Sequence, residues 1–200
     1  RYRSFDFGYA KPFSVGWWAV DYDGRVYRYR ELYGCTGQPN VGVKWTPAKI
    51  AEEIRKIEDK YEKGNHIIGI ADPSIWDAST GESIATTMER YRVYFEPADN
   101  DRISGKMQFH YRLAFDQEGR PMMYVFNTCK DFIRTIPNLV YDEHDVEDVD
   151  TDGEDHIYDE SRYFLQRNPI PPRRNVLSKL QPYNPLATEE PRDLYGFMRL

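Results

Sequence analysis

The sequence predicts an α/β fold in which helices flank a mixed central β-sheet. Residues 2–9, 15–21 and 25–33 form short runs separated by turn-forming residues, which predicts three strands in an antiparallel meander. An amphipathic helix follows the meander. Residues 66–71 then form a nearly continuous apolar run, as expected for a strand buried on both faces.

The helix after the meander has clear signals at both ends. Thr46 is a suitable N-cap, Pro47 suits the first helical position, and Gly64 suits the position just beyond the last turn. Apolar residues between them recur at spacings of three and four, which gives the helix one face to bury.

Further elements follow the buried strand. The pattern predicts helices at 83–91, 101–113, 128–136 and 156–166, a strand at 92–95, and a hairpin over 113–126 that turns at 117–119. This element order is that of an RNase H-like fold of the resolvase and integrase type. Residues 1–167 are expected to form that domain. Residues 168–200 hold six of the 13 prolines and are expected to form an extended or docked tail.

The acidic residues are unevenly distributed. The 200 residues carry a net charge of −6, yet residues 141–160 alone hold 11 acidic side chains and no Lys or Arg. The rest of the chain has 27 basic and 22 acidic residues and is mildly basic. Such a cluster is typical of a solvated loop, and it can also bind a cation.

The sequence is not expected to belong to a membrane-spanning, secreted, zinc-binding or disulfide-rich protein. No apolar run approaches the ~20 residues that span a bilayer, and no signal peptide is visible. Cys35 and Cys129 lie far apart and lack the spacing of a zinc site or disulfide scaffold, which fits a reducing cytosol.

Two aspartates lie where strands could present them to a ligand. Asp6 lies inside an aromatic strand, where carboxylates are disfavoured and costly to bury, and Gly8 permits a close approach. Asp72 follows the buried strand, at the end where α/β proteins place functional groups. Each also has a structural interpretation: Asp6 can face solvent on an edge strand, and Asp72 can simply open an Asp-Pro turn.

His156 and Asp159 are three residues apart on the last predicted helix, which places them on one face. Alone, they also fit a solvated acidic helix start. Together with Asp6 and Asp72, they could converge and bind two Mg²⁺ or Mn²⁺ ions, as in nucleases and polymerases. We therefore predict that these four residues are catalytic and metal-binding.

Four basic residues are candidate contacts for DNA phosphates. Arg102, Lys106 and Arg112 flank a glycine in a predicted helix, and Lys11 follows the first strand. The three helical residues fit a solvated helix face equally well. No helix-turn-helix or zinc-finger signature is present, which predicts little sequence preference.

Several motifs, in this order, resemble the C-terminal nuclease domain of the large terminase subunit of tailed double-stranded DNA phages. The resemblance covers about residues 1–167. The motifs are FDFGYAKPFS at 5–14, IADPS at 70–74, NTCK and RTIP within 127–137, EDVDT at 147–151 and EDHIYDESRY at 154–163.

This resemblance implies an RNase H-like endonuclease that uses Mg²⁺ or Mn²⁺ to cut concatemeric viral double-stranded DNA during packaging in the host cytoplasm. It places Asp6, Asp72 and Asp159 on the family's metal-binding carboxylates, and His156 where related sites hold a second ligand on the last helix. It also implies the portal, the small terminase subunit and a terminase ATPase domain as partners. Because the sequence lacks GxxxxGK[ST], that ATPase domain is expected to be absent from this chain.

Two alternatives remain open at this point. A Holliday-junction resolvase or transposase core would share the fold and the acid cluster. A non-catalytic module that docks on a portal or capsid would instead need Asp6 and Asp72 to lie far apart.

Overall fold

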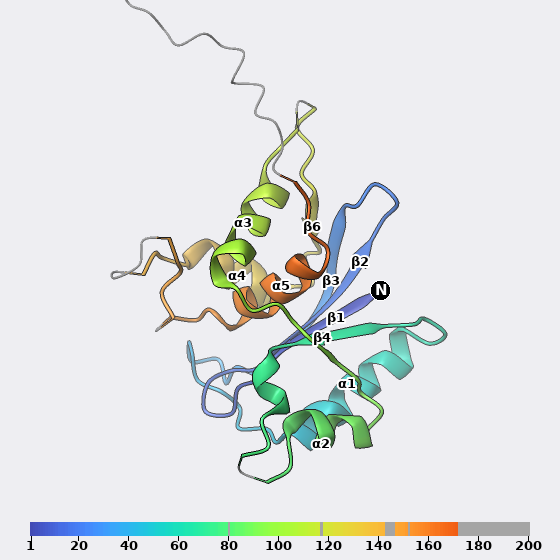
Figure 1. Cartoon of the computed structure of the whole chain (residues 1–200). Coiled ribbons are helices and arrows are strands. Elements are labelled where there is room, and N and C mark those ends of the chain that lie inside the picture. Colours follow the sequence, from blue (N-terminus) through green and yellow to red (C-terminus); the bar gives the residue numbers. More distant parts are fainter. Residues whose placement is uncertain (80, 117, 143–146, 152, 172–200) are drawn as a thin grey trace, which may run out of the picture.

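A mixed six-stranded sheet forms the centre of the protein, with strand order β5-β4-β1-β2-β3-β6 (Figure 1). The structure is a computed structural model that describes residues 1–171, except residues 80, 117, 143–146 and 152. The strands are β1 (Tyr2–Asp6), β2 (Ser14–Val20), β3 (Val26–Tyr33), β4 (Ile68–Ala71), β5 (Glu96–Pro97) and β6 (Met123–Val125). The helices are α1 (Pro47–Tyr61), α2 (Ile84–Arg90), α3 (Arg102–Leu113), α4 (Lys130–Thr135) and α5 (His156–Arg167).

The predicted meander is confirmed, because β1 pairs antiparallel with β2 and β2 with β3. The buried strand is confirmed as β4, which pairs parallel with β1. The predicted start of α1 is also confirmed, since the Thr46 side chain accepts a hydrogen bond from the Lys49 amide and Pro47 opens the helix. Gly64 lies beyond α1 at φ 85°, a conformation that favours glycine.

Two predicted strand regions are wrong. Residues 92–95 form no strand, and the short β5 begins only at Glu96, because Arg92 adopts a left-handed φ of 60°. The predicted hairpin over 113–126 is replaced by α3, a turn and β6. Asp116 stabilises this turn by accepting hydrogen bonds from the amides of Glu118 and Arg120, while Gln117 lies outside the described residues. The strand β6 then pairs parallel with β3.

The predicted helices are present, with small changes at their ends. Ser83 and Asp101 cap α2 and α3 by accepting amide hydrogen bonds from the first turn. The helix α4 ends at Thr135, before Pro137, and is followed by a 3-10 turn, Ile136–Asn138, that contains this proline. Proline fits there because the first turn of a helix needs no amide donor.

The sheet has an apolar core on each face. In one core, Phe5, Trp17 and Ala71 of the sheet pack against α1 and α2, which contribute Ile54 and Met88. The opposite core packs α3, α4 and α5 against the other face of the sheet, as Figure 1 shows. The two consecutive tryptophans of β2 illustrate the alternation of strand side chains, since Trp17 lies in the first core and Trp18 in the second.

The chain beyond α5 first lies against α3. The amide and carbonyl of Ile170 both hydrogen-bond the side chain of Gln108, and the Arg112 guanidinium donates to the carbonyl of Asn168. Residues 172–200 of the predicted tail lie outside the described residues. Cys35 and Cys129 are both free, and no helix in the described part of the chain is long and apolar enough to cross a membrane.

We predict that a chain ending at residue 171 folds with an unchanged melting temperature, and that a chain ending at Arg167 folds but melts roughly 5 °C lower. The shorter chain loses the Asn168 acceptor of the buried Arg112 guanidinium. Thermal denaturation followed by circular dichroism measures both. An insoluble chain 1–171 would show instead that residues 172–200 belong to the domain.

Candidate active site

The register of two parallel strands places Asp6 and Asp72 side by side. Phe5 of β1 pairs with Ala71 of β4, and the Asp72 amide donates to the Phe5 carbonyl at 3.3 Å. Asp6 and Asp72 are the next residues of their strands, so both lie at the carboxyl ends. Because strand side chains alternate, both belong to the face on which Ser4 and Ile70 contact α5 or its core.

Two residues of α5, one in its first turn and one two turns later, contact these two aspartates. His156 opens the helix, and its Nδ1 lies 3.4 Å from Oδ2 of Asp6. Seven residues later, the Tyr163 hydroxyl donates to Oδ2 of Asp72 at 2.7 Å. Seven residues make two helical turns, so both side chains point from one face of α5 toward the strand ends.

Asp159 lies between these two contacts along α5 and is held by two arginines. The Arg162 Nε donates to Oδ1 of Asp159 at 2.7 Å. Arg102, from α3, donates from Nη1 to both oxygens of Asp159, at 3.1 and 3.2 Å. The third predicted carboxylate is therefore present on the same helix face, but it is engaged by cationic side chains.

A buried carboxylate fixes the position of α5 on the sheet. Glu160 is fully buried and accepts hydrogen bonds from Arg28 at 2.7 Å, from Ser14 at 3.2 Å, and from Ser4 and Trp18. Gly16 of β2 leaves the necessary space, since a Cβ there would lie 2.3 Å from both the Arg28 guanidinium and the Glu160 carboxylate.

The sequence patterns did not reveal this role of Glu160. The available signal was its spacing of four from His156, which places both residues on the face of the helix toward the sheet.

Negative charge is concentrated at the strand ends. Burial and the charges of Asp159 and Asp155 raise the pKa of Asp6 to about 7, although the contact with His156 opposes that rise. Burial and the charge of Asp159 likewise raise the pKa of Asp155 to about 6, against the opposing charges of His156 and Arg102. Asp155 is 4% exposed and is a second residue that sequence reasoning missed.

The partners of His156 and Asp72 favour the charged forms of both side chains. Burial favours the neutral form of His156, but the carboxylates of Asp6, Asp155 and Asp159 outweigh it and raise the pKa of the imidazole. For Asp72, burial is likewise outweighed, here by hydrogen bonds from Ser74 and Tyr163, and its pKa is lowered. Its Oδ1 caps the turn Pro73–Trp76 through the Ser74 amide at 2.7 Å, so Asp72 also has the turn-opening role considered from the sequence.

The residues fit a divalent cation in kind. Carboxylates and an imidazole from β1, β4 and α5 face one region, where burial, together with the charges of Asp159 and Asp155, raises the pKa of Asp6. In the side-chain conformations of the described residues, however, no three His, Cys, Asp or Glu side chains are arranged to hold an ion. Asp159 is turned toward Arg102 and Arg162.

The four candidate DNA contacts fall into different environments. Lys11 is exposed, on the loop that joins β1 to β2. Lys106 donates to the carbonyl of Glu147 at 2.7 Å, and Arg102 binds Asp148 and Asp159. The expectation for Arg112 is corrected: it is 1% exposed and donates to the carbonyls of Gly24 and Asn168, so its role is structural.

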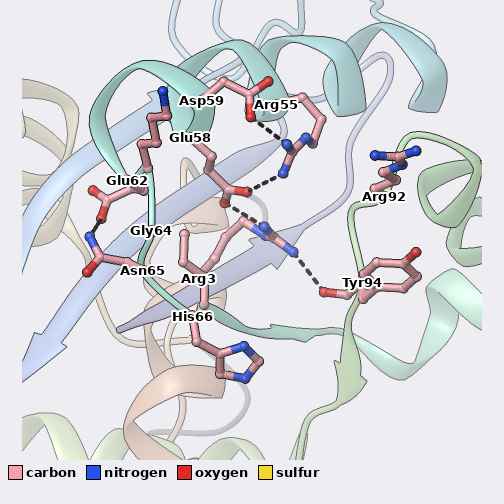
Figure 2. A pocket seen from close by; sticks show the side chains of 12 residues that line it. Arg3, Arg55, Glu58, Asp59, Glu62, Gly64, Asn65, His66, Arg92 and Tyr94 are labelled. Atoms are coloured by element: carbon pink, nitrogen blue, oxygen red, sulfur yellow. Dashed lines mark hydrogen bonds and ion pairs between the residues drawn. The ribbon is translucent and has the colours of Figure 1, made fainter.

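A pocket of about 310 Å³ lies at the other end of the sheet, beside the start of β4 and the end of α1. Figure 2 shows the pair that lines it: the buried Arg3 guanidinium donates to Glu58 at 2.5 Å and to the Tyr94 carbonyl at 2.7 Å. Arg55 also pairs with Glu58 at 3.7 Å. The acids of this pocket are thus satisfied by arginines, and the pocket lies away from Asp6 and Asp72.

Comparison with solved structures relates the fold to known proteins. The large terminase from the thermophilic bacteriophage D6E in complex with ADP matches with a TM-score of 0.65 and 24% sequence identity, over 82% of this chain. Another crystal form of that protein gives a TM-score of 0.65 and 24% identity over 83% of this chain. The fold resembles that of a phage large terminase. It is an RNase H-like α/β fold, as predicted.

The chain spans 38% of the length of that terminase. The yeast mitochondrial Holliday junction resolvase matches more weakly, with a TM-score of 0.40 and 11% identity over 83% of this chain and 76% of the resolvase. No model of a protein family matches the sequence, and no curated protein matches it either.

The half-buried position of Asp6 predicts a pH-dependent stability difference in protein stripped of metal with EDTA. Its pKa of about 7 in the folded chain exceeds the ~3.9 expected after unfolding, so the folded state binds more protons between those values. The contribution of this group to stability must therefore fall as pH rises from about 4 to 7. We expect Asp6→Asn to melt above the wild type by a margin that is larger at pH 7.5 than at pH 5.

Asp59→Asn is the matched control, because Asp59 lies exposed on α1 and its substitution makes the same change in charge. It should show no comparable growth of the margin with pH. An Asp6→Asn margin that stays constant between pH 5 and pH 7.5 would contradict the assigned environment of Asp6.

Proposed function

We propose that this chain is the nuclease part of a phage large terminase, which hydrolyses viral double-stranded DNA with two divalent metal ions. The observation that carries the proposal is the convergence of Asp6, Asp72 and Asp159 from β1, β4 and α5 on one end of an RNase H-like sheet. A portal- or capsid-docking module without catalysis would leave Asp6 and Asp72 apart, whereas these residues continue paired neighbouring strands.

Asp6, Asp72 and Asp159 would hold the cations, with His156 as a further ligand. Bound Mg²⁺ or Mn²⁺ would neutralise charge on the scissile phosphate and lower the pKa of the attacking water. His156 is oriented for this role by Asn40, whose side-chain oxygen lies 3.0 Å from Nε2. With Nε2 donating to Asn40, binding of a cation would displace the proton from Nδ1, which could then act as the ligand nitrogen.

The remaining residues of the site position these ligands. Tyr163 holds Asp72 through its hydroxyl, and Glu160 holds α5 against the sheet. Asp155 adds negative charge beside Asp6 and Asp159, which favours binding of cations. DNA would be bound through its phosphates by side chains such as Lys11, with Lys106 and Arg102 available only after release from their present contacts.

In the virus, the substrate would be concatemeric DNA, cut wherever packaging stops. The partners would be an ATPase domain, the portal and the small terminase subunit, all inside the host cell. These proposals rest on the similarity in fold and on the motifs at 5–14, 70–74 and 154–163.

We predict that Asp6→Asn, Asp72→Asn and Asp159→Asn each reduce plasmid cleavage by roughly 100-fold or more, because each removes charge that would hold the cations. Cleavage of supercoiled plasmid in Mn²⁺ measures this, with circular dichroism to verify the fold. Asp59→Asn should cut like the wild type. Full cleavage by one of the three purified variants would remove that residue from the catalytic set.

We also predict cleavage with little sequence preference that stops with EDTA and declines as salt rises toward ~200 mM, since binding through phosphates weakens steeply with salt. Sequencing the ends of a digested plasmid tests the preference. One dominant cut sequence would favour a resolvase-like or site-specific enzyme instead.

A further inference from the structure

The guanidinium of Arg102 lies among three carboxylates. Its Nε donates to Asp148 at 2.5 Å, its Nη1 donates to Asp159 at 3.1 Å, and its Nη2 lies 3.9 Å from Asp155. The same Nη2 donates to the carbonyl of Val149 at 3.3 Å. Arg102 is therefore the cation around which the acids of α5 and of the acidic segment are arranged in this structure.

The position of this guanidinium is well fixed. Arg102 is the first residue of α3, whose N-cap Asp101 is secured by the Ser104 amide at 2.7 Å. One turn later, Lys106 donates to the Glu147 carbonyl and lies 4.5 Å from the centre of the Tyr141 ring. Two basic residues of one helix face thus hold residues 147–149, which belong to the acid-rich stretch before α5, beside that helix.

Both oxygens of Asp159 are engaged by Arg102, and Oδ1 is also engaged by Arg162. A carboxylate whose oxygens both accept from a guanidinium has few lone pairs left to coordinate a metal ion. This contact explains why residues of suitable chemistry do not form a cluster able to hold an ion.

We propose that Arg102 sets the affinity of this site for divalent cations, because a metal ion must displace its guanidinium from Asp159. Arg162 differs from Arg102 in this respect. It touches only one oxygen of Asp159, and its Nη1 is held by the Asn100 carbonyl at 2.8 Å, so it can stay in place as a positioning residue. The inference rests on the proposed function, since it assumes that Asp159 is a ligand.

The experiment is titration of the full chain with Mn²⁺ by isothermal calorimetry, which requires no DNA cleavage. Arg102→Gln removes the competing charge and should lower the Kd for Mn²⁺ by roughly 10-fold or more. Arg102→Lys keeps the charge but loses the planar guanidinium, which contacts Asp148 through Nε and Asp159 through Nη1. Its Kd should therefore lie between those of Arg102→Gln and the wild type. Arg90→Gln is the matched control, because Arg90 is exposed on α2, lies outside the candidate site and pairs with Glu82.

Thermal denaturation provides the second readout. Without metal, Arg102→Gln should melt below the wild type, since three carboxylates lose their shared partner, and Mn²⁺ should raise its melting temperature more than that of the wild type. Should Arg102→Gln fold poorly, Arg102→Lys carries the same comparison.

The outcomes separate this inference from the proposed function. Unchanged or weaker Mn²⁺ binding by both Arg102 variants, with binding by the wild type intact, would overturn the role of Arg102 alone. Absence of Mn²⁺ binding by the wild type and by both variants would overturn the metal-dependent function as well. Tighter binding by Arg102→Gln, unmatched by Arg90→Gln, is the result that the proposal predicts.

Discussion

The buried carboxylate of Glu160 is the contact that relates α5 to the sheet. It accepts hydrogen bonds from β1, β2 and β3, through Ser4, Ser14, Trp18 and Arg28, at a place with no access to water. Removing one partner of such a pair leaves a buried charge uncompensated, at a cost of about 3–5 kcal/mol. The helix therefore has one favourable rotation and height on the sheet. That geometry brings His156 to Asp6 and Tyr163 to Asp72.

The acids that surround this helix are opposed by a small number of cations. Asp6, Asp155 and Asp159 repel one another, as the raised pKa values of Asp6 and Asp155 indicate. Arg102, Arg162 and His156 offset part of that repulsion. Such an arrangement does not maximise the stability of the chain, and clusters of perturbed carboxylates of this kind are typical of functional sites. Stability is supplied elsewhere, by the two apolar cores.

Much of the fold followed from local pattern. The meander, the caps of α1 and the continuous apolar run of β4 depend on neighbouring residues, so sequence alone predicted them. The strand at 92–95 and the hairpin over 113–126 failed because tertiary contacts decide those regions: Arg92 adopts a left-handed conformation, and β6 pairs with the distant β3.

The site was predicted less completely than the fold. Strand ends and helix spacing indicated Asp6, Asp72, His156 and Asp159, but not their partners. The Arg102 contact joins residues 57 positions apart in the chain, and the pairing of Arg28 with Glu160 spans 132. No local periodicity carries such information. For the same reason, the burial of Arg112 was not predicted from the sequence.

The proposed cation site lies between the carboxyl ends of β1 and β4 and the helix α5. The most direct measurement is X-ray diffraction from crystals soaked in Mn²⁺, with data collected at the manganese absorption edge. We expect anomalous density between Asp6, Asp72 and Asp159, with the Arg102 side chain turned away from Asp159. Fully soaked crystals that show Asp159 still bound by Arg102, and no anomalous density near these carboxylates, would contradict it.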